Sequence, residues 1–227
     1  MTSLRRVLAP PALVAIVAVA VVVGVGLFVI PADRLQGQVQ RIMYVHVPSA
    51  WIAYLAFFVT LGASVRYLWR RDLGADRLAA ASAEVGLVFT GVTIVTGAIW
   101  GKATWGIWWD WDPRLTTTAL LFLIYAGYLL IRASLADRVR RARASAVIGI
   151  VGFANVPIVH FSVLWWRSLH QPPTVIRPGD PSINHLLLAE LLASVLAFTV
   201  LYLYLLDRRL DLERARDETD QALLVSS

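Results

Sequence analysis

The stretch ALVAIVAVAVVVGVGLFVI occupies residues 12–30 and contains nineteen consecutive residues without a charged side chain. Apolar runs of this length are typical of helices that cross a lipid bilayer, which need about 20 residues. A secretory signal peptide is the rival interpretation, but its apolar core is normally about 7–15 residues long. This run is longer and ends directly before Pro31. We therefore expect an uncleaved membrane span.

Five further apolar blocks follow along the chain, and short charged segments separate them. Of the 227 residues, 58% are hydrophobic and only 16% are charged, whereas a soluble domain carries about 25% charge. The sequence predicts an all-α membrane protein with six transmembrane helices in one domain, residues 1–227, whose residues 207–227 form a cytoplasmic tail. The six predicted spans cover residues 12–30, 48–69, 78–100, 115–131, 144–166 and 185–206.

The basic residues are distributed unequally between the two sides that these spans define. Cytoplasmic segments of membrane proteins carry the excess of Lys and Arg, so the richer side is predicted to be cytoplasmic and to hold both termini. This distribution accounts for the net charge of +6 without any binding of nucleic acid. The fifteen residues on the richer side are Arg5, Arg6, Arg66, Arg70, Arg71, Arg77, Arg132, Arg138, Arg140, Arg141, Arg143, Arg208, Arg209, Arg214 and Arg216, against six on the other.

Two absences in the sequence exclude whole classes of chemistry. The chain contains no cysteine, which rules out a disulfide framework, a cysteine-ligated metal cluster, a thiol nucleophile and a CxxCH site for covalent haem attachment. It also lacks the GxxxxGK[ST] loop that binds nucleotide phosphates. Any ATP-driven step would therefore require another chain.

Tryptophan is concentrated on the side that we predict to face outward. An ordinary aromatic belt would populate both membrane interfaces, but eight of the nine tryptophans lie on one side. The segment WGKATWGIWWDWDPRLT at residues 100–116 is the densest part, and it is too short to cross the membrane. It is expected to lie along the interface, where it either receives a flat aromatic ligand or plugs the end of the bundle. The eight are Trp51, Trp100, Trp105, Trp108, Trp109, Trp111, Trp165 and Trp166.

Two histidines stand next to this aromatic region. His46 precedes the second predicted span and His170 follows the fifth. Imidazole is a ligand of haem iron, and two such side chains on either side of an aromatic platform would make an axial pair. Simple solvation is the alternative for either residue, and His185 is a competing ligand. His160 is expected to be a core histidine that forms a hydrogen bond near Asn155.

Five cations on the predicted outer side are candidates to pair with the propionate groups of a haem, although each is also explained as an interfacial anchor. Arg114 is favoured because it belongs to the tryptophan-rich segment. Asp112 is expected either to pair with Arg114 or to cap the fourth span. Glu190 is an acid inside a predicted span, where such residues are costly and often functional. The five cations are Arg41, Lys102, Arg114, Arg167 and Arg177.

These segments carry a resemblance to a known family. WGIWWDWDPRLT at residues 105–116 resembles the WWD signature of haem-handling proteins. Together with MYVHVPSAW at 43–51 and WWRSLHQ at 165–171, it resembles the CcmC family of cytochrome c maturation, roughly over residues 41–206. The resemblance implies haem b at the outer face over an extracytoplasmic WWD loop, with His46 and His170 as axial ligands of the iron. The haem-binding positions that it implies within the motif are Trp105, Trp108, Trp109, Trp111, Asp112 and Arg114.

The resemblance also implies a cellular role. The chain would reside in the bacterial inner membrane and present haem to the chaperone CcmE, in an ABC transporter complex with CcmA, CcmB and CcmD. It leaves open whether the chain is an enzyme that promotes the covalent haem–chaperone bond or only a scaffold. A permease that exports haem or another substrate is the alternative, suggested by Pro157 and Asn155 at mid-depth. A redox cytochrome is disfavoured because only His160 lies deep in a span.

Overall fold

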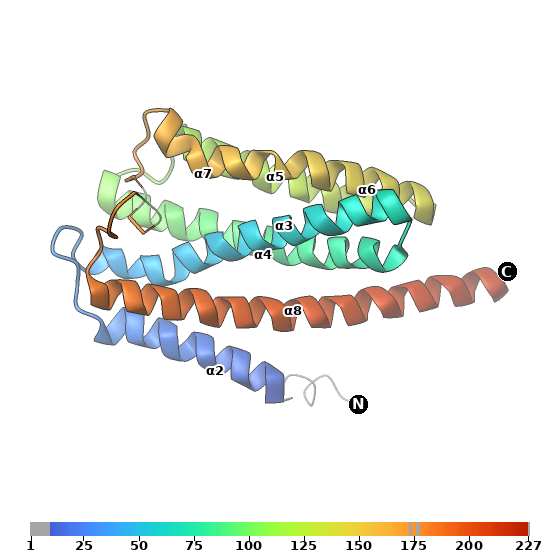
Figure 1. Ribbon diagram of the computed structural model, residues 1–227, viewed down its shortest axis with the longest axis horizontal. Coiled ribbons are helices and arrows are strands. Elements are labelled where there is room, and N and C mark those ends of the chain that lie inside the picture. Colours follow the sequence, from blue (N-terminus) through green and yellow to red (C-terminus); the bar gives the residue numbers. More distant parts are fainter. Residues whose placement is uncertain (1–9, 173, 176–177, 227) are drawn as a thin grey trace.

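The computed structural model describes residues 10–172, 174–175 and 178–226, and Figure 1 shows them as a bundle of long helices. Within these residues no β-strand occurs. Six helical segments are long and apolar enough to cross a membrane, so the predicted all-α membrane fold with six spans is confirmed. These segments are Pro10–Val29, Gln38–Arg70, Leu73–Trp105, Pro113–Ser134, Arg138–Trp165 and His185–Asp217.

Several of these segments combine more than one helical element. The first joins an α-helix to a short π-helix, the second begins with a 3₁₀ turn, and the fifth contains two α-helices. The elements in chain order are α2 (Pro10–Gly24), η1 (Val25–Val29), η2 (Gln38–Ile42), α3 (Met43–Arg70), α4 (Leu73–Trp105), α5 (Pro113–Ser134), α6 (Arg138–Phe153), α7 (Asn155–Trp165) and α8 (His185–Ser226).

The boundaries of the tryptophan-rich loop, residues 106–112, follow from local chemistry. Gly106 ends α4 with a φ of 79°, in the left-handed region that glycine tolerates best. At the other end, the Asp112 side chain accepts hydrogen bonds from the first backbone N–H groups of α5. Pro113 then occupies the first turn, where its missing N–H costs nothing. The loop is therefore held at both ends by residues of the motif itself.

The fifth span is interrupted between α6 and α7. Pro157 has no N–H to donate to the carbonyl four residues earlier, so the helical ladder breaks near Ala154. The Asn155 side chain donates a hydrogen bond to the carbonyl of Thr117 in α5, at 2.8 Å. This bond ties the break to the neighbouring helix α5.

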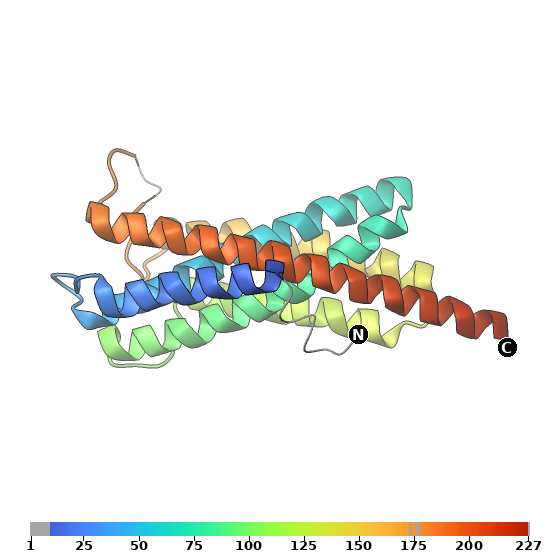
Figure 2. The ribbon, with the colours of Figure 1, turned by 90° about the horizontal axis from the view of Figure 1, so that it is seen from below.

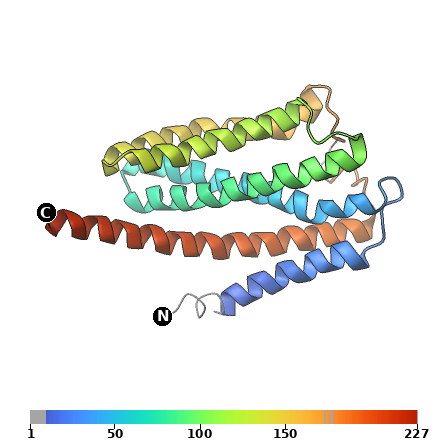
Figure 3. The same ribbon diagram turned by 180° about the vertical axis from the view of Figure 1, so that it is seen from behind.

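The core lies between α3, α4, α5 and α8, where small and aromatic residues interlock. The rings of Phe57 and Tyr125 stack at 3.6 Å between centroids. Gly86 allows α4 to approach α3 closely, since a Cβ at this position would lie 2.7 Å from Phe57. By contrast, α2 packs mainly on α8 and flanks the bundle, as Figures 2 and 3 show.

The two ends of the bundle differ in composition. The connecting segments 30–42, 106–112 and 166–172 gather at one end, which we call the tryptophan-rich end (Figure 1). The short turns after α3 and α5 lie at the other, which we call the arginine-rich end. The last part of α8 also extends toward the arginine-rich end.

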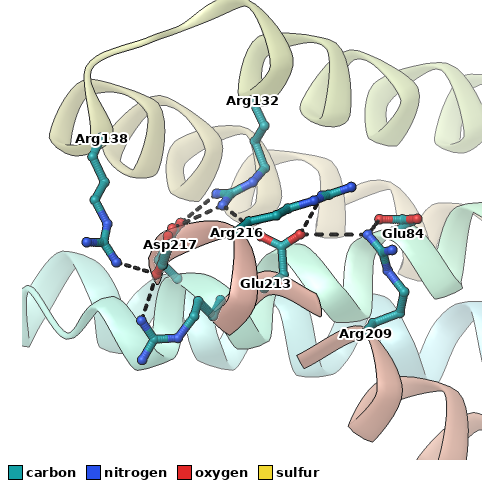
Figure 4. Close-up of polar contacts among 9 residues, drawn as sticks. Glu84, Arg132, Arg138, Arg209, Glu213, Arg216 and Asp217 are labelled. Carbon is teal, nitrogen blue, oxygen red and sulfur yellow. Dashed lines mark hydrogen bonds and ion pairs between the residues drawn. The ribbon is translucent and has the colours of Figure 1, made fainter. Parts of the chain in front are cut away.

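An ion-pair network occupies the arginine-rich end (Figure 4). Arg132 of α5 donates two hydrogen bonds to Asp76 of α4, at 2.6 and 3.1 Å, and both side chains are nearly buried. Asp217 of α8 pairs with Arg77, at 2.8 Å, and with Arg138. The network therefore joins α4, α5, α6 and α8. Its further pairs are Arg209 with Glu84, and Glu213 with Arg132, Arg209 and Arg216.

Candidate functional site

Two adjoining cavities open at the tryptophan-rich end, with volumes of ≈ 240 and ≈ 100 Å³. Four residues line both of them: His46 of α3, Gly97 of α4, Arg114 of α5 and His170 from the segment after α7. The cavities therefore meet where four separate parts of the chain converge. The two histidines that the sequence analysis singled out, 124 positions apart in the printed sequence, are brought to the same place.

His46 is held against one turn of α4. Its Nδ1 lies 3.0 Å from the Thr96 hydroxyl oxygen, and the Trp100 ring meets the imidazole edge-on at 5.7 Å. A Cβ added to Gly97 would lie 3.0 Å from Cε1 of His46, so only a glycine leaves room for the ring in this position. The imidazole is thereby fixed by neighbours on a rigid helix.

His170 lies on the connecting segment between α7 and α8. Trp105 meets its ring edge-on at 5.1 Å. Its Nδ1 is buried, has no hydrogen-bond partner among the described residues, and lies 3.9 Å from Oδ1 of Asp112. Burial and, to a smaller extent, the Arg114 charge lower the pKa of His170 to about 4, while Asp112 opposes the shift. The ring is therefore neutral at pH 7 and can offer a nitrogen lone pair to a metal.

Asp112 connects the tryptophan-rich loop to the segment that carries His170. Its carboxylate accepts hydrogen bonds from the backbone N–H groups of Arg114 and Leu169, both at 2.8 Å. Burial would raise its pKa, but hydrogen bonds from Ser168, Leu169 and Arg114 outweigh burial and the pKa is lowered. Of the two predicted roles, capping is the one found, and no ion pair with the Arg114 side chain occurs in the described residues.

Arg114 is the cation that faces both cavities. One terminal nitrogen donates a hydrogen bond to the carbonyl of His160, at 2.8 Å. Its Nε is buried and has no partner within the described parts of the chain. A guanidinium with unused donors at a cavity wall is suited to an anionic group such as a carboxylate.

The four tryptophans of the motif divide into two pairs. Trp105 lines the larger cavity and Trp109 the smaller one. Trp108 and Trp111 line neither and are 59% and 79% exposed. The structure thus brings Trp105 and Trp109 together with His46, His170 and Arg114, and leaves Trp108, Trp111 and Asp112 outside the cavity walls.

The remaining two histidines, His160 and His185, line neither cavity. His185 is the exposed first residue of α8 and lines neither. The half-buried ring of His160 packs edge-on against Tyr54, at 6.3 Å, and against Phe161. The expected hydrogen bond of the His160 side chain near Asn155 is not found in the described residues: the Asn155 amide donates to the Thr117 carbonyl, and the His160 ring makes aromatic contacts.

Of the other candidate cations, those that the structure describes line neither cavity. Arg41 donates hydrogen bonds to the carbonyls of Leu27 and Ile30, where it caps the first span. Lys102 donates to the carbonyl of Gly106 at 2.8 Å. Arg167 is exposed and lines neither cavity, and Arg177 lies outside the described residues. Glu190 is half-buried, and its Oε1 has no partner in the described residues.

The contribution of α4 to the cavity walls was not predicted from the sequence. Small and polar side chains form a stripe along this helix, at intervals of three and four residues, and the stripe faces the cavities. A stripe of this kind in an otherwise apolar span is a signal that the sequence contains. Thr96, which contacts His46, was missed as well. The stripe consists of Thr93, Gly97, Gly101 and Thr104.

A family model described as CcmC, heme exporter protein C, matches residues 1–224 of the chain. The chain belongs to the CcmC family. It is similar to the heme exporter protein C of Bradyrhizobium diazoefficiens, with 40% identity over 215 residues that cover 92% of this chain and 81% of the relative. The protein of the same name from Haemophilus influenzae is 38% identical over 194 residues, covering 85% and 78%. A putative cytochrome c biosynthesis ccmC-like mitochondrial protein of Marchantia polymorpha is 38% identical over 160 residues, covering 70% and 68%.

The match confirms the predicted membership of the CcmC family. This CcmC-family chain is a multi-pass membrane protein, because its six apolar helices and its bacterial relatives agree. The cavity at the tryptophan-rich end lies where the motif that carries the resemblance meets both histidines.

Proposed function

We propose that this CcmC-family chain binds haem b at the periplasmic face of the bacterial inner membrane and presents it to the haem chaperone CcmE for cytochrome c maturation. One observation carries the proposal: His46 and His170 line the same pair of cavities, together with Arg114. Two neutral nitrogen ligands and a cation are the groups that a haem with its propionates requires.

The residues present fit this cargo. His46 and His170 would be the axial ligands of the iron, and the buried Nε of Arg114 that lacks a partner supports pairing with a propionate. Trp105 and Trp109 offer aromatic faces and edges at the cavity walls. Haem itself supplies the reactive chemistry, so the part left to the protein is binding, orientation and exclusion of water.

The size of the site supports presentation rather than storage. The two adjoining cavities measure ≈ 240 and ≈ 100 Å³, and together they fall at the lower end of the about 300–1,000 Å³ of pockets that enclose a ligand of drug size. A porphyrin would therefore be only partly enclosed. The exposed rings of Trp108 and Trp111 lie beyond the cavity walls and would support the part that protrudes. A partly exposed cargo is accessible to a receiving chaperone.

The location rests on the distribution of basic residues. Most Lys and Arg lie at the arginine-rich end or in the segments that connect to it, which assigns that end and both termini to the cytoplasm. The haem site would then face the periplasm. Since the chain has no nucleotide-binding loop, we propose that it acts in a complex with CcmA, CcmB and CcmD, one of which would supply ATP hydrolysis.

A haem permease is a second candidate, and the interrupted fifth span favours it. Broken helices at mid-depth often form the substrate path of transporters. The side-chain amide at the break, on Asn155, is already engaged by the Thr117 carbonyl, and Asn155 is buried. Because this bond ties α7 to α5, we assign the break a structural role. The permease would be supported if the chain alone moved haem across the bilayer of sealed vesicles.

The proposal is tested by producing the chain together with CcmE and measuring two quantities: the absorption spectrum of haem that copurifies with the chain, and the haem that remains covalently attached to CcmE on a denaturing gel. His46→Ala and His170→Ala should lose both. His185→Ala is the matched control, because His185 is exposed and lines neither cavity, and it should retain both. Covalent haem on CcmE in the absence of this chain, or unchanged haem in both histidine variants, would overturn the proposal.

A further inference from the structure

We propose that Thr96 is a positioning residue that fixes the tautomer of His46 and thereby directs Nε2 of His46 toward the haem iron. This inference rests on the proposed haem function and deepens it. It concerns a residue outside the tryptophan motif, on a different helix from the histidine that it positions.

The hydrogen-bond geometry around the Thr96 hydroxyl determines which partner supplies the proton. The oxygen lies 2.7 Å from the carbonyl of Val92 and 3.3 Å from that of Thr93. Carbonyl oxygens can only accept, and the hydroxyl has a single hydrogen to donate. The Val92 carbonyl is the nearest acceptor, and in the arrangement that we propose the hydroxyl donates its hydrogen there and turns its lone pairs toward His46.

The consequence for His46 follows directly. Its Nδ1, at 3.0 Å from the hydroxyl oxygen, must carry the proton and donate it. In a neutral imidazole the other nitrogen, Nε2, then holds the free lone pair. Metal-binding histidines commonly donate from one ring nitrogen to a fixed acceptor, which selects the tautomer and raises the basicity of the ligating nitrogen.

Contacts with the same turn of α4 hold the His46 ring in this orientation. Gly97 permits the imidazole to lie against the helix backbone, because any Cβ there would approach Cε1 to 3.0 Å. Trp100 contacts the ring edge-on with an interplanar angle of 89°. The three residues Thr96, Gly97 and Trp100 thus restrict both the rotation and the tilt of His46. His170 differs, since its Nδ1 has no hydrogen-bond partner in the described residues.

The experiment compares Thr96→Val, which keeps the shape but removes the hydroxyl, with Thr96→Ser, which restores it. Thr90→Val is the matched control, because Thr90 also lies on α4 and donates to a carbonyl four residues earlier but is not among the residues that contact His46. With purified protein and added haem, Thr96→Val should bind ferric haem about 10–100-fold more weakly. Its midpoint potential should shift to more positive values, because a less basic ligand stabilises the ferric state less. Thr96→Ser and Thr90→Val should behave as wild type.

A second measurement needs neither a variant at Thr96 nor bound haem. Nitrogen-15 NMR of the haem-free wild-type protein, labelled at histidine and assigned with His46→Ala, should show His46 as the Nδ1–H tautomer. The Nε2–H tautomer, or a Thr96→Val protein with wild-type affinity and potential, would overturn the role of Thr96. If His46→Ala also kept the wild-type haem spectrum, the ligand assignment in the proposed function would fail instead. If His46→Ala lost haem while Thr96→Val behaved as wild type, only the proposed role of Thr96 would be wrong.

Discussion

The tryptophan-rich and arginine-rich ends of the bundle are built from the same helices but use polar groups in opposite ways. At the arginine-rich end, each acid of the network meets at least one guanidinium, as Asp76 does with Arg132 at 2.6 Å. At the tryptophan-rich end, Nδ1 of His170 and Nε of Arg114 are buried without a partner in the described residues. Buried polar groups normally find partners. Unpaired guanidinium nitrogens also occur at the arginine-rich end, on Arg141 and Arg209. Among the described residues, however, the buried imidazole nitrogen without a partner lies at the tryptophan-rich end, and such a nitrogen can ligate a metal. This difference supports the tryptophan-rich end as the one that binds haem.

Burial also separates the tryptophan-rich loop from the ion pairs of the arginine-rich end. Trp108 and Trp111 expose more than half of their surface at one end, whereas the nearly buried pair at the other end leaves only 11% of the Arg132 side chain accessible. From this comparison we expect that changes at the arginine-rich end affect stability and that changes at the tryptophan-rich end affect haem.

The largest effect is expected from Arg132→Ala. The substitution leaves the Asp76 carboxylate buried without its partner, and removal of one member of a buried ion pair costs about 3–5 kcal/mol. We expect the free energy of unfolding, measured by denaturant titration in mild detergent, to fall by this amount while the folded fraction keeps its haem affinity. Arg214→Ala is the control, since its ion pair with Asp211 is exposed and contributes at most about 1 kcal/mol. Equal losses in the two variants would remove the contrast between the ends.

Arg114→Ala should produce the next largest effect, and on haem rather than on stability. One hydrogen bond to a charged group contributes about 1.5–3 kcal/mol, which corresponds to roughly 10–150-fold in affinity. Haem titration followed by absorbance should show a loss in this range. Arg167→Ala removes an exposed cation that lines neither cavity and should bind haem as wild type does. If Arg167→Ala weakened haem binding as strongly, general charge rather than the cavity would be responsible.

A smaller effect should separate the two pairs of tryptophans. Trp105→Leu removes an aromatic contact at the cavity wall, where such pairs contribute about 0.5–1.5 kcal/mol, and haem affinity should fall by about 2–10-fold. Trp111→Leu should lower haem affinity by less than Trp105→Leu does, since this ring is 79% exposed, lines neither cavity and would meet only the protruding part of the haem. A haem titration compares the two directly. Equal effects would show that the division between inward and outward rings has no consequence for binding.

The smallest effect is expected from pH. Because the pKa of His170 is lowered to about 4, against an ordinary value near 6.5, protons do not compete with iron for this ring until the pH approaches 4. Haem affinity should therefore stay nearly constant between pH 8 and about 5.5. The stability that the neutral ring contributes is present above pH 6.5 and is lost as the pH falls from 6.5 toward 4. A tenfold loss of haem affinity by pH 5.5 would contradict a buried, neutral His170.

The sequence was informative where a pattern is local. The run at residues 12–30 and its five counterparts predicted six spans because the bilayer dictates the length of each. Asp112 indicated the start of α5, because capping of this helix was one of the two roles predicted for it. These features depend on neighbours within a few residues, so one sequence is enough to recognise them.

Other features depend on packing between distant residues. The contact of Thr96 with His46 joins two helices, and no local pattern pairs these positions. Nor did the motif reveal that Trp105 and Trp109 line the cavities while Trp108 and Trp111 do not, because the loop conformation decides this. The hydrogen bond from Asn155 to the Thr117 carbonyl likewise joins α7 to α5, and no local pattern pairs these two positions.

The most direct test of the central claim is a titration of ferric haem into the purified haem-free protein, followed by the Soret absorption, for wild type, His46→Ala, His170→Ala and Arg132→Ala. We predict saturable binding with a low-spin spectrum for wild type and for the folded fraction of Arg132→Ala, and loss of that spectrum in both histidine variants. The account would be contradicted if both histidine variants kept the wild-type spectrum, or if folded Arg132→Ala lost it, because haem would then not be held by His46 and His170 at the tryptophan-rich end.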